Sequence, residues 1–154
     1  MELLDIQSSV NQLKKLIEDS IIKGGDEGKN NLIRSQTPIN LLHNAAKASF
    51  IQNGVNPNCI NPAYGTSDGE LKLAGFFKKK DQDVCILPNN VSAKEEILVF
   101  EGILRGERDP YGTELTEKIL SVNVRSQLSS IAKNFDTLYE RTFAESLNLH
   151  LRCQ

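Results

Sequence analysis

The chain has 154 residues, of which 39% are hydrophobic and 25% are charged, and its formal net charge is −2. This length and composition are typical of one globular domain, and no apolar run approaches the roughly 20 residues of a membrane-spanning helix. A chain with this charge has no overall attraction for nucleic acid, so a nucleic-acid function would require cations gathered on one face.

The amino terminus has acids before its basic pair and no apolar stretch ending in small residues. It therefore does not resemble a secretory signal, and we expect a cytoplasmic protein. Cys59, Cys85 and Cys153 are widely spaced and odd in number, which favours reduced thiols over a disulfide framework. With only His43 and His150 as further ligands, a structural zinc site is disfavoured.

Two helices are predicted in the first third of the chain. Apolar residues at helical spacing predict a helix over residues 3–22, and the paired glycines that follow it indicate a loop over residues 24–31. Thr37 followed by Pro38 is typical of a helix start, so a second helix is expected over residues 38–53.

The pattern then changes from helix to strand. Residues 70–77 and 83–87 are predicted strands, joined by a turn over residues 78–82. The apolar run at residues 97–104 indicates a strand or a short helix, and its type stays open at this point. A further strand is expected over residues 118–125 because apolar and polar residues alternate there.

A long amphipathic helix follows the last strand, over residues 126–151. The order of elements predicts an α+β or mixed α/β fold, with amino-terminal helices, a small mixed sheet of three to four strands and a long carboxy-terminal helix. We expect one domain over residues 1–154, with a helical portion (1–54), a strand-rich portion (55–125) and the long helix.

The junction between this last strand and the long helix carries several polar groups. Asn123 and Arg125 end the alternating segment, and Ser126 and Gln127 follow directly where the helical pattern begins. A strand that delivers a cation and amides to the start of a helix is a common way to build a phosphate-facing site. The position of these residues at a junction distinguishes them from the charged residues along the exposed face of the long helix.

The segment from Val122 to Asn134, VNVRSQLSSIAKN, with its continuation FDTLYERTFAESLNLHLR, resembles a segment of type II restriction endonucleases. The resemblance implies the core of the PD-(D/E)xK superfamily, which has a helix, three strands, a helix and a strand. It also implies double-stranded DNA as the substrate, magnesium as the cofactor and a possible homodimer. The predicted order over residues 38–149 is similar to that core without its final strand.

Several site residues follow from this resemblance. Asp83, at the head of the second strand, matches the metal-binding acid, since magnesium prefers oxygen ligands. Asn123-Val124-Arg125 stands where the family usually has an acid, any residue and lysine. Asn123 would then be a substitute ligand, and Arg125 would stabilise phosphate charge without transferring protons, because arginine stays protonated.

A second placement uses Glu70 and Lys72, whose spacing puts both side chains on one strand face and makes them a competing catalytic pair. A solvated strand face explains the same pattern.

The basic run, Lys78-Lys79-Lys80, is the densest group of cations in the sequence and would suit contact with a DNA backbone. Charge runs are, however, usually solvated turns. The remaining predicted DNA-binding residues lie at the junction and on the long helix. The full predicted DNA-binding set is Lys78, Lys79, Lys80, Arg125, Ser126, Gln127 and Lys133.

The function expected from this reasoning is sequence-specific, magnesium-dependent hydrolysis of DNA, or an inactive fragment of such an enzyme. The alternative is a non-enzymatic DNA-binding or protein-interaction module, in which the long helix pairs with a partner or with its own copy. A cleft joining Asp83, Glu70 and Arg125 would favour the nuclease. An exposed apolar stripe on a terminal helix would favour assembly.

Overall fold

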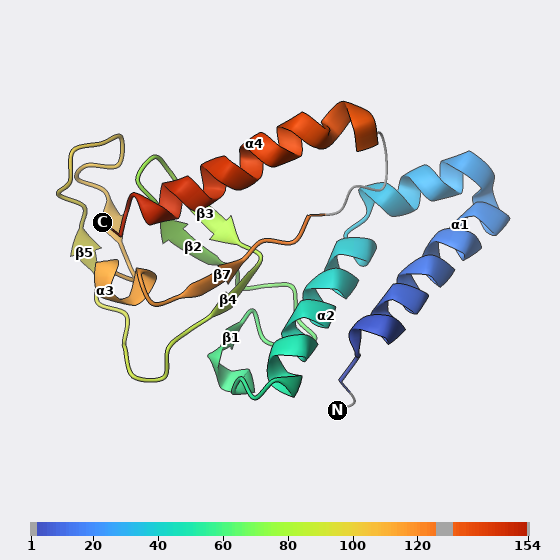
Figure 1. Cartoon of the computed structure of the whole chain (residues 1–154), viewed down its shortest axis with the longest axis horizontal. Helices are drawn as coiled ribbons and strands as arrows, with labels where there is room; N and C mark the ends of the chain where they lie inside the picture. Colours follow the sequence, from blue (N-terminus) through green and yellow to red (C-terminus); the bar gives the residue numbers. More distant parts are fainter. Residues whose placement is uncertain (1–2, 126–130, 154) are drawn as a thin grey trace.

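The computed structural model describes residues 3–125 and 131–153, with the side chains of the second range described from Phe135 onward. Two helices, α1 (Ile6–Arg34) and α2 (Thr37–Gln52), lie side by side at one end of the molecule, the strands extend from the middle to the opposite end, and α4 (Ile131–His150) runs along one side (Figure 1). The predicted α+β class is confirmed. None of the helices in these ranges is long and apolar enough to cross a membrane.

Helix α1 (Ile6–Arg34) begins at Asp5, whose carboxylate accepts a hydrogen bond of 2.6 Å from the Ser8 amide. The expected end near residue 22 corresponds to a break at Gly25, where φ is 54° and ψ is −140°. The loop predicted over residues 24–31 is wrong, because the chain returns to helix directly after that glycine. One residue in a left-handed conformation is enough to kink the helix here.

Helix α2 (Thr37–Gln52) has Pro38 in its first turn, as predicted, and turns one face to the core. Its buried residues include two small apolar ones, Ala45 and Ala48, and two polar ones, His43 and Lys47. The chain continues through the 3-10 helix η1 (Pro57–Cys59) into the strands. Polar side chains on a buried helix face require partners, because burial removes their hydration.

The strands form three small antiparallel sheets. The central sheet has the order β1-β4-β7, and two further pairs, β2-β3 and β5-β6, lie beside it. Buried apolar side chains from the sheets and from the short helix α3 fill the core. The strands and α3 are β1 (Ile60–Asn61), β2 (Leu71–Ala74), β3 (Lys79–Gln82), β4 (Val84–Ile86), β5 (Glu96–Ile97), β6 (Arg108–Asp109), β7 (Leu120–Val122) and α3 (Thr113–Thr116).

The turn predicted over residues 78–82 is wrong in position. The Gly75 amide donates to the Lys78 carbonyl at 3.0 Å, so the turn precedes the basic run and most of that run lies in β3. Asn148 of α4 holds this turn: its Oδ1 accepts hydrogen bonds from the amides of Phe77 at 2.7 Å and Lys78 at 3.2 Å. A Cβ at Gly75 would overlap the Asn148 side-chain amide, so only glycine allows this approach.

Residues 97–104, for which the sequence pattern leaves strand and helix open, are mostly loop. Only the first of them lies in a strand, and the chain returns through β6, so the segment is the connection of a small hairpin. The strand predicted over residues 118–125 is confirmed in its middle as β7. The long helix is confirmed as α4 (Ile131–His150), while the expected start at residue 126 lies outside the described residues.

Candidate functional site

Asp83 lies between β3 and β4, where the chain leaves the two-stranded sheet and enters the central sheet. Val84 pairs with Val122 of β7, so Asp83 lies beside Asn123 at the end of that ladder. Its Oδ2 accepts a hydrogen bond of 2.7 Å from the Val124 amide. The fold therefore brings together Asp83 and residues 123–125.

Arg125 connects Asp83 to the last helix. Its Nη1 lies 3.6 Å from Asp83 Oδ2, and its Nη2 contacts both carboxylate oxygens of Glu145 at 2.6 Å. Lys80 of β3 forms a further ion pair with Glu145. Burial alone would raise the pKa of Glu145, but the hydrogen bonds from Lys80 and Arg125 bring it below its ordinary value. We call Lys80, Asp83, Arg125 and Glu145 the Asp83 cluster.

His43 reaches the Asp83 cluster from α2. Its Nε2 lies 3.8 Å from Asp83 Oδ2, beyond hydrogen-bond distance, and it has no hydrogen-bond partner among the described residues although it is buried. Burial lowers the pKa of His43; Asp83 opposes that shift, and Lys47 and Arg125 add to it. A buried imidazole nitrogen without a partner beside a carboxylate is a candidate for binding a ligand.

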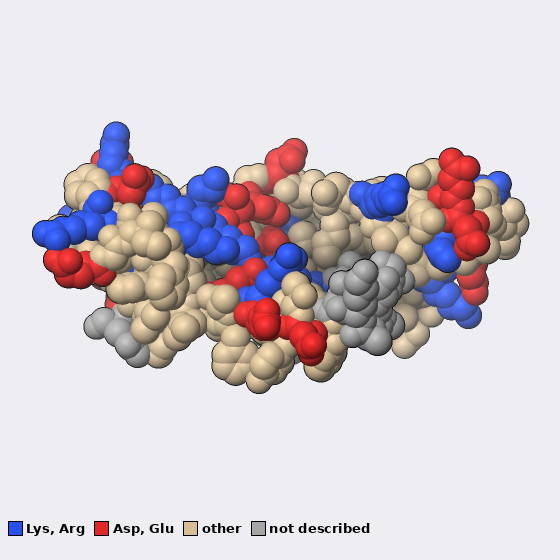
Figure 2. Space-filling view, turned by 90° about the horizontal axis from the view of Figure 1, so that it is seen from above, with Lys and Arg blue, Asp and Glu red and all other residues tan. Residues whose placement is uncertain are grey.

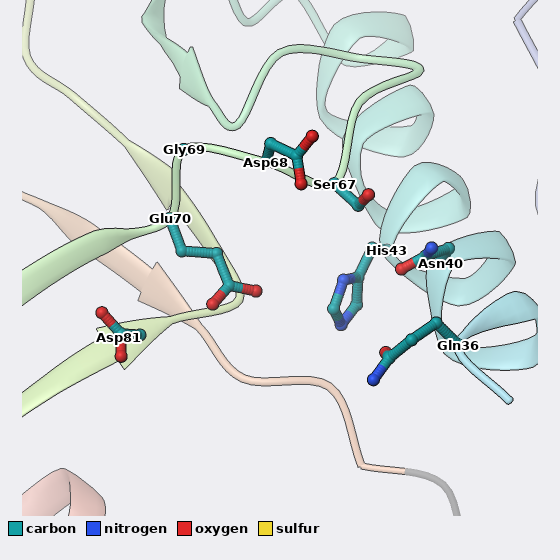
Figure 3. Close-up of a pocket in the computed structure, with 8 residues that line it drawn as sticks. All are labelled: Gln36, Asn40, His43, Ser67, Asp68, Gly69, Glu70 and Asp81. Atoms are coloured by element: carbon teal, nitrogen blue, oxygen red, sulfur yellow. The ribbon is translucent and has the colours of Figure 1, made fainter. Parts of the chain in front are cut away.

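A polar pocket of about 540 Å³ opens between α2, the loop before β2 and the start of the two-stranded sheet. Figure 3 shows the Glu70 carboxylate and the His43 ring extending toward each other across it, with Asp81 on the strand side. Partial desolvation raises the pKa of Glu70, and the charges of Asp83 and Asp81 raise it further against the opposing effect of Lys47. The pocket thus concentrates negative charge. Its lining residues are Gln36, Asn40, His43, Ser67, Asp68, Gly69, Glu70 and Asp81.

The competing pair, Glu70 and Lys72, is divided by its contacts. Glu70 lines the pocket, whereas Lys72 Nζ forms an ion pair of 3.5 Å with Asp81 across the β2-β3 ladder. Lys72 is exposed, so its ammonium is hydrated as well as paired. Glu70 therefore belongs to the site by position, and Lys72 reaches it only through Asp81.

Lys47 is fully buried on α2 and supports the loop that forms one wall of the pocket. Its Nζ donates to the carbonyls of Ala63 at 3.3 Å and Thr66 at 2.7 Å. Burial lowers the pKa of Lys47, and the charge of Glu70 opposes this shift. Neither Lys47 nor His43 was predicted as a site residue. Their signal in the sequence is two polar side chains one turn apart on an otherwise apolar helix face.

Asn123 has a partly unsatisfied side chain. Its Nδ2 lies 3.3 Å from Oε1 of the buried Gln82, which also accepts a hydrogen bond of 2.5 Å from Ser121. Its Oδ1 is buried and has no hydrogen-bond partner within the described chain. The substitute ligand predicted from the sequence therefore has a buried carbonyl oxygen without a hydrogen-bond partner among the described residues.

The predicted DNA-binding cations are mostly occupied. Lys79 pairs with Glu107 at 2.9 Å and Lys80 pairs with Glu145, whereas the Lys78 side chain is exposed. Figure 2 shows basic and acidic side chains interspersed over the face that it views. Ser126, Gln127 and the side chain of Lys133 lie outside the described residues. A basic surface is therefore not what sets this site apart.

Nowhere in the described ranges do three His, Cys, Asp or Glu side chains converge as a ready metal-binding group. The charged residues of the site are instead the acids that line the pocket, Asp68, Glu70 and Asp81, together with the Asp83 cluster.

Comparison with known proteins adds no relative: no family model, curated protein or solved structure matches this chain. Any functional conclusion must therefore come from the geometry and from the resemblance of residues 122–152.

Proposed function

We propose that this chain is a magnesium-dependent DNA endonuclease of the restriction type, or an inactive fragment of one, acting in the cytoplasm. The observation that carries the proposal is the position of Asp83. It lies just before β4, against Asn123 and Arg125 in the segment that follows β7, and close to the pocket that Glu70 and His43 line. The sequence resemblance implies an acid close to two polar residues that are separated by one residue. Asp83, Asn123 and Arg125 correspond to these three positions.

The donor groups fit magnesium better than they fit a softer metal. Asp83 and Glu70 supply carboxylate oxygens, and Asn123 has a carbonyl oxygen without a partner among the described residues. Magnesium retains several waters and commonly binds through one or two carboxylates together with substrate phosphates. The absence of a three-residue group in the described chain is therefore compatible with a site that DNA completes.

When bound, magnesium would stabilise charge on the scissile phosphate and lower the pKa of a coordinated water. In hydrolysis, the oxygen of water adds to phosphorus, one bond between phosphorus and a deoxyribose oxygen breaks, and the leaving oxygen takes up a proton. Arg125 stays protonated and serves as an electrostatic group facing the phosphate. Glu145 and Asp83 hold its guanidinium in place.

The test is cleavage of mixed-sequence duplex DNA with and without magnesium at low salt. We expect discrete fragments from the wild type, and a decrease in cleavage of at least about a hundredfold in Asp83→Asn and in Glu70→Gln with DNA binding retained. Glu101→Gln is the matched control, because this exposed carboxylate contacts only Arg105 on its own loop among the described ion pairs. Equal cleavage by Asp83→Asn and the wild type would remove the assignment.

Binding of DNA without cleavage by the wild type would identify the inactive form of the proposal. The chain itself contains a reason for that result, because arginine at position 125 cannot exchange protons as the lysine of the family pattern can. In that case Arg125→Lys is the informative variant. A gain of magnesium-dependent cleavage in it would assign the defect to this residue.

A second candidate function, helix-mediated protein interaction, is favoured by a different observation. Large apolar side chains are exposed along α4, away from the pocket. The exposed apolar stripe that would favour assembly is therefore present, whereas the polar pocket is lined by Glu70 but by neither Asp83 nor Arg125. The two functions are compatible, because the exposed apolar row and the pocket use different residues.

A further inference from the structure

One face of α4 exposes a continuous row of large apolar side chains. Phe135, Tyr139, Phe143 and Leu147 follow one another at intervals of four residues, and they are 62%, 60%, 62% and 45% exposed. The rings of Tyr139 and Phe143 are 5.0 Å apart and tilted by 48°. The row extends about 18 Å along the helix. We call these four residues the α4 stripe.

A hollow of about 280 Å³ lies beside the α4 stripe. Leu138 and Thr142 form part of it on the helix, the three aromatic residues of the stripe line it as well, and Arg125 closes one side. Its lining is mostly apolar apart from Arg125 and Thr142, and it is open to solvent. The same helix face thus combines exposed aromatic rings with a mostly apolar recess that these rings help to line.

The exposed area is large enough to matter for association. An aromatic side chain buries about 150–250 Å² when covered completely. At the exposures above, the α4 stripe would contribute about 400 Å² from each copy and about 800 Å² for a pair. Stable interfaces bury roughly 1,200–2,000 Å² in total, so the stripe supplies about two thirds of the smallest of these. Flanking residues and the hollow would provide the remainder.

The charges beside the stripe select the direction of pairing. Asp136 and Glu140 are exposed in the amino-terminal half of α4. In the carboxy-terminal half, the acid is Glu145, which is neutralised by Lys80 and Arg125. Parallel pairing would place Asp136 and Glu140 against their own copies. Antiparallel pairing places them against the half without a free carboxylate, and it also aligns the two helix dipoles favourably.

We propose that the α4 stripe is the interface of a symmetric homodimer in which the two α4 helices pack antiparallel. A surface that contacts its own copy about a twofold axis closes after two chains, whereas a contact between two different surfaces continues into rings or filaments. Helix α1 also exposes apolar residues, but they form two separate groups, Ile6 with Val10 and Ile21 with Ile22. Of these two helices, α4 is the one whose exposed apolar side chains form a continuous row.

The interface adjoins the candidate site through Arg125. Its guanidinium contacts Asp83 and Glu145, while the same residue lines the hollow beside the stripe. An aromatic ring from the second copy would pack against Arg125 from the hollow and exclude water from its ion pairs. This proposal does not depend on the proposed nuclease function, because it concerns association in the absence of DNA and metal.

The experiment is sedimentation velocity of the full chain without DNA or metal, over a concentration series up to about 100 μM. We expect the wild type to form a dimer. In Tyr139→Glu and in Phe143→Glu, the dissociation constant of the dimer should be at least about a hundredfold higher. Each of these substitutions places two desolvated carboxylates, one from each copy, at the centre of the contact. Circular dichroism checks that the variants retain their helices, which is expected for residues this exposed.

The matched control is Ile22→Glu, at a residue of α1 that is 81% exposed. Dimerisation should be unchanged in this variant, since it places the same charge on an apolar surface outside the stripe. A wild type that remains monomeric over the whole series would overturn the proposal and leave the stripe to a different polypeptide. Equal loss of the dimer in Ile22→Glu and Tyr139→Glu would overturn it too.

Discussion

Two arginines, each placed between two carboxylates, show how differently the same chemistry is used in this fold. Arg152 has a side chain that is only 4% exposed, and it binds Glu96 at 2.5 Å and the fully buried Asp109 at 3.2 Å. Arg125 is 34% exposed and binds Glu145 and Asp83. The contact between Arg152 and Asp109 is enclosed by protein, although Arg152 and Glu96 also line a pocket of about 280 Å³, whereas Arg125 itself is partly exposed.

The surroundings of the two arginines explain the difference. Arg152 also donates to Thr113 Oγ1 at 2.5 Å and lies 5.2 Å from the centre of the Phe100 ring, so it joins the end of α4 to the β5-β6 hairpin. Beside Arg125, His43 Nε2 and Asn123 Oδ1 have no hydrogen-bond partner within the described chain; at Arg152, its own Nε also has none. An enclosed ion pair with nearly all its donors used is structural, and an open one with unused polar atoms nearby is a candidate site.

The largest expected effect comes from removing the enclosed arginine. In Arg152→Met, Asp109 stays buried without its cation, and the free energy of unfolding should fall by about 3–5 kcal/mol. Urea denaturation followed by circular dichroism measures this loss. Arg105→Met is the control, because Arg105 forms an exposed pair with Glu101 and should cost less than about 1 kcal/mol. Equal losses in the two variants would contradict the structural role of Arg152.

A smaller effect is expected at the wall of the pocket. Lys47→Met keeps the apolar stem but leaves the carbonyls of Ala63 and Thr66 without their donor, which should cost about 1–3 kcal/mol. Because that loop carries Glu70, hydrogen exchange should also become faster in residues 63–70 and remain unchanged around Arg152. Uniformly faster exchange throughout the domain would instead indicate a general loss of stability.

The ion pairs of the Asp83 cluster predict that the stability of the fold depends on pH. The pKa of Glu145 lies below its ordinary value of 4.5, so its interactions stabilise the fold above about that pH and are lost as the pH falls through the lowered value. Glu145→Gln should therefore be less stable than the wild type at pH 7, by about 1–3 kcal/mol. The difference should shrink below pH 4.5 in urea unfolding. A constant difference from pH 7 to pH 3 would exclude this role of the carboxylate.

The smallest expected effect separates two neighbouring lysines. Lys78→Ala should leave stability unchanged and weaken DNA binding, reducing the dependence of log affinity on log salt by about one. Lys80→Ala should instead lower stability, because its ammonium pairs with the half-buried Glu145. Fluorescence anisotropy with labelled duplex DNA at several salt concentrations measures the first effect. The reverse assignment of the two lysines would contradict the contacts of their side chains.

Local patterns predicted the three long helices, because a helix depends on the periodicity of its apolar residues. They failed at the basic run, which has the composition of a turn and yet forms β3, since Asn148 holds the turn earlier in the chain. They also failed after Gly25, where the polar segment is helical. In both places, contacts or conformations outside the local pattern decide the structure.

The site was predictable in part for the same reason. Asp83, Asn123 and Arg125 follow from a sequence resemblance. His43 and Lys47 do not, because a polar residue on a helix shows its importance only when the fold buries it. Lys72 lies in β2 and Glu70 directly precedes that strand, and Asp81, which pairs with Lys72 and also lines the pocket, divides their roles. Spacing alone does not reveal such cross-strand partners.

The most direct test of the central claim, that the Asp83 cluster and its pocket form a magnesium-dependent site, is thermal unfolding in the presence of duplex DNA, with and without magnesium. A ligand at about ten times its dissociation constant stabilises by about 1.4 kcal/mol, so the wild type should gain roughly 3–6 °C. Glu101→Gln should gain the same amount, and Asp83→Asn should gain none. No gain in the wild type, or an equal gain in Asp83→Asn, would contradict the account.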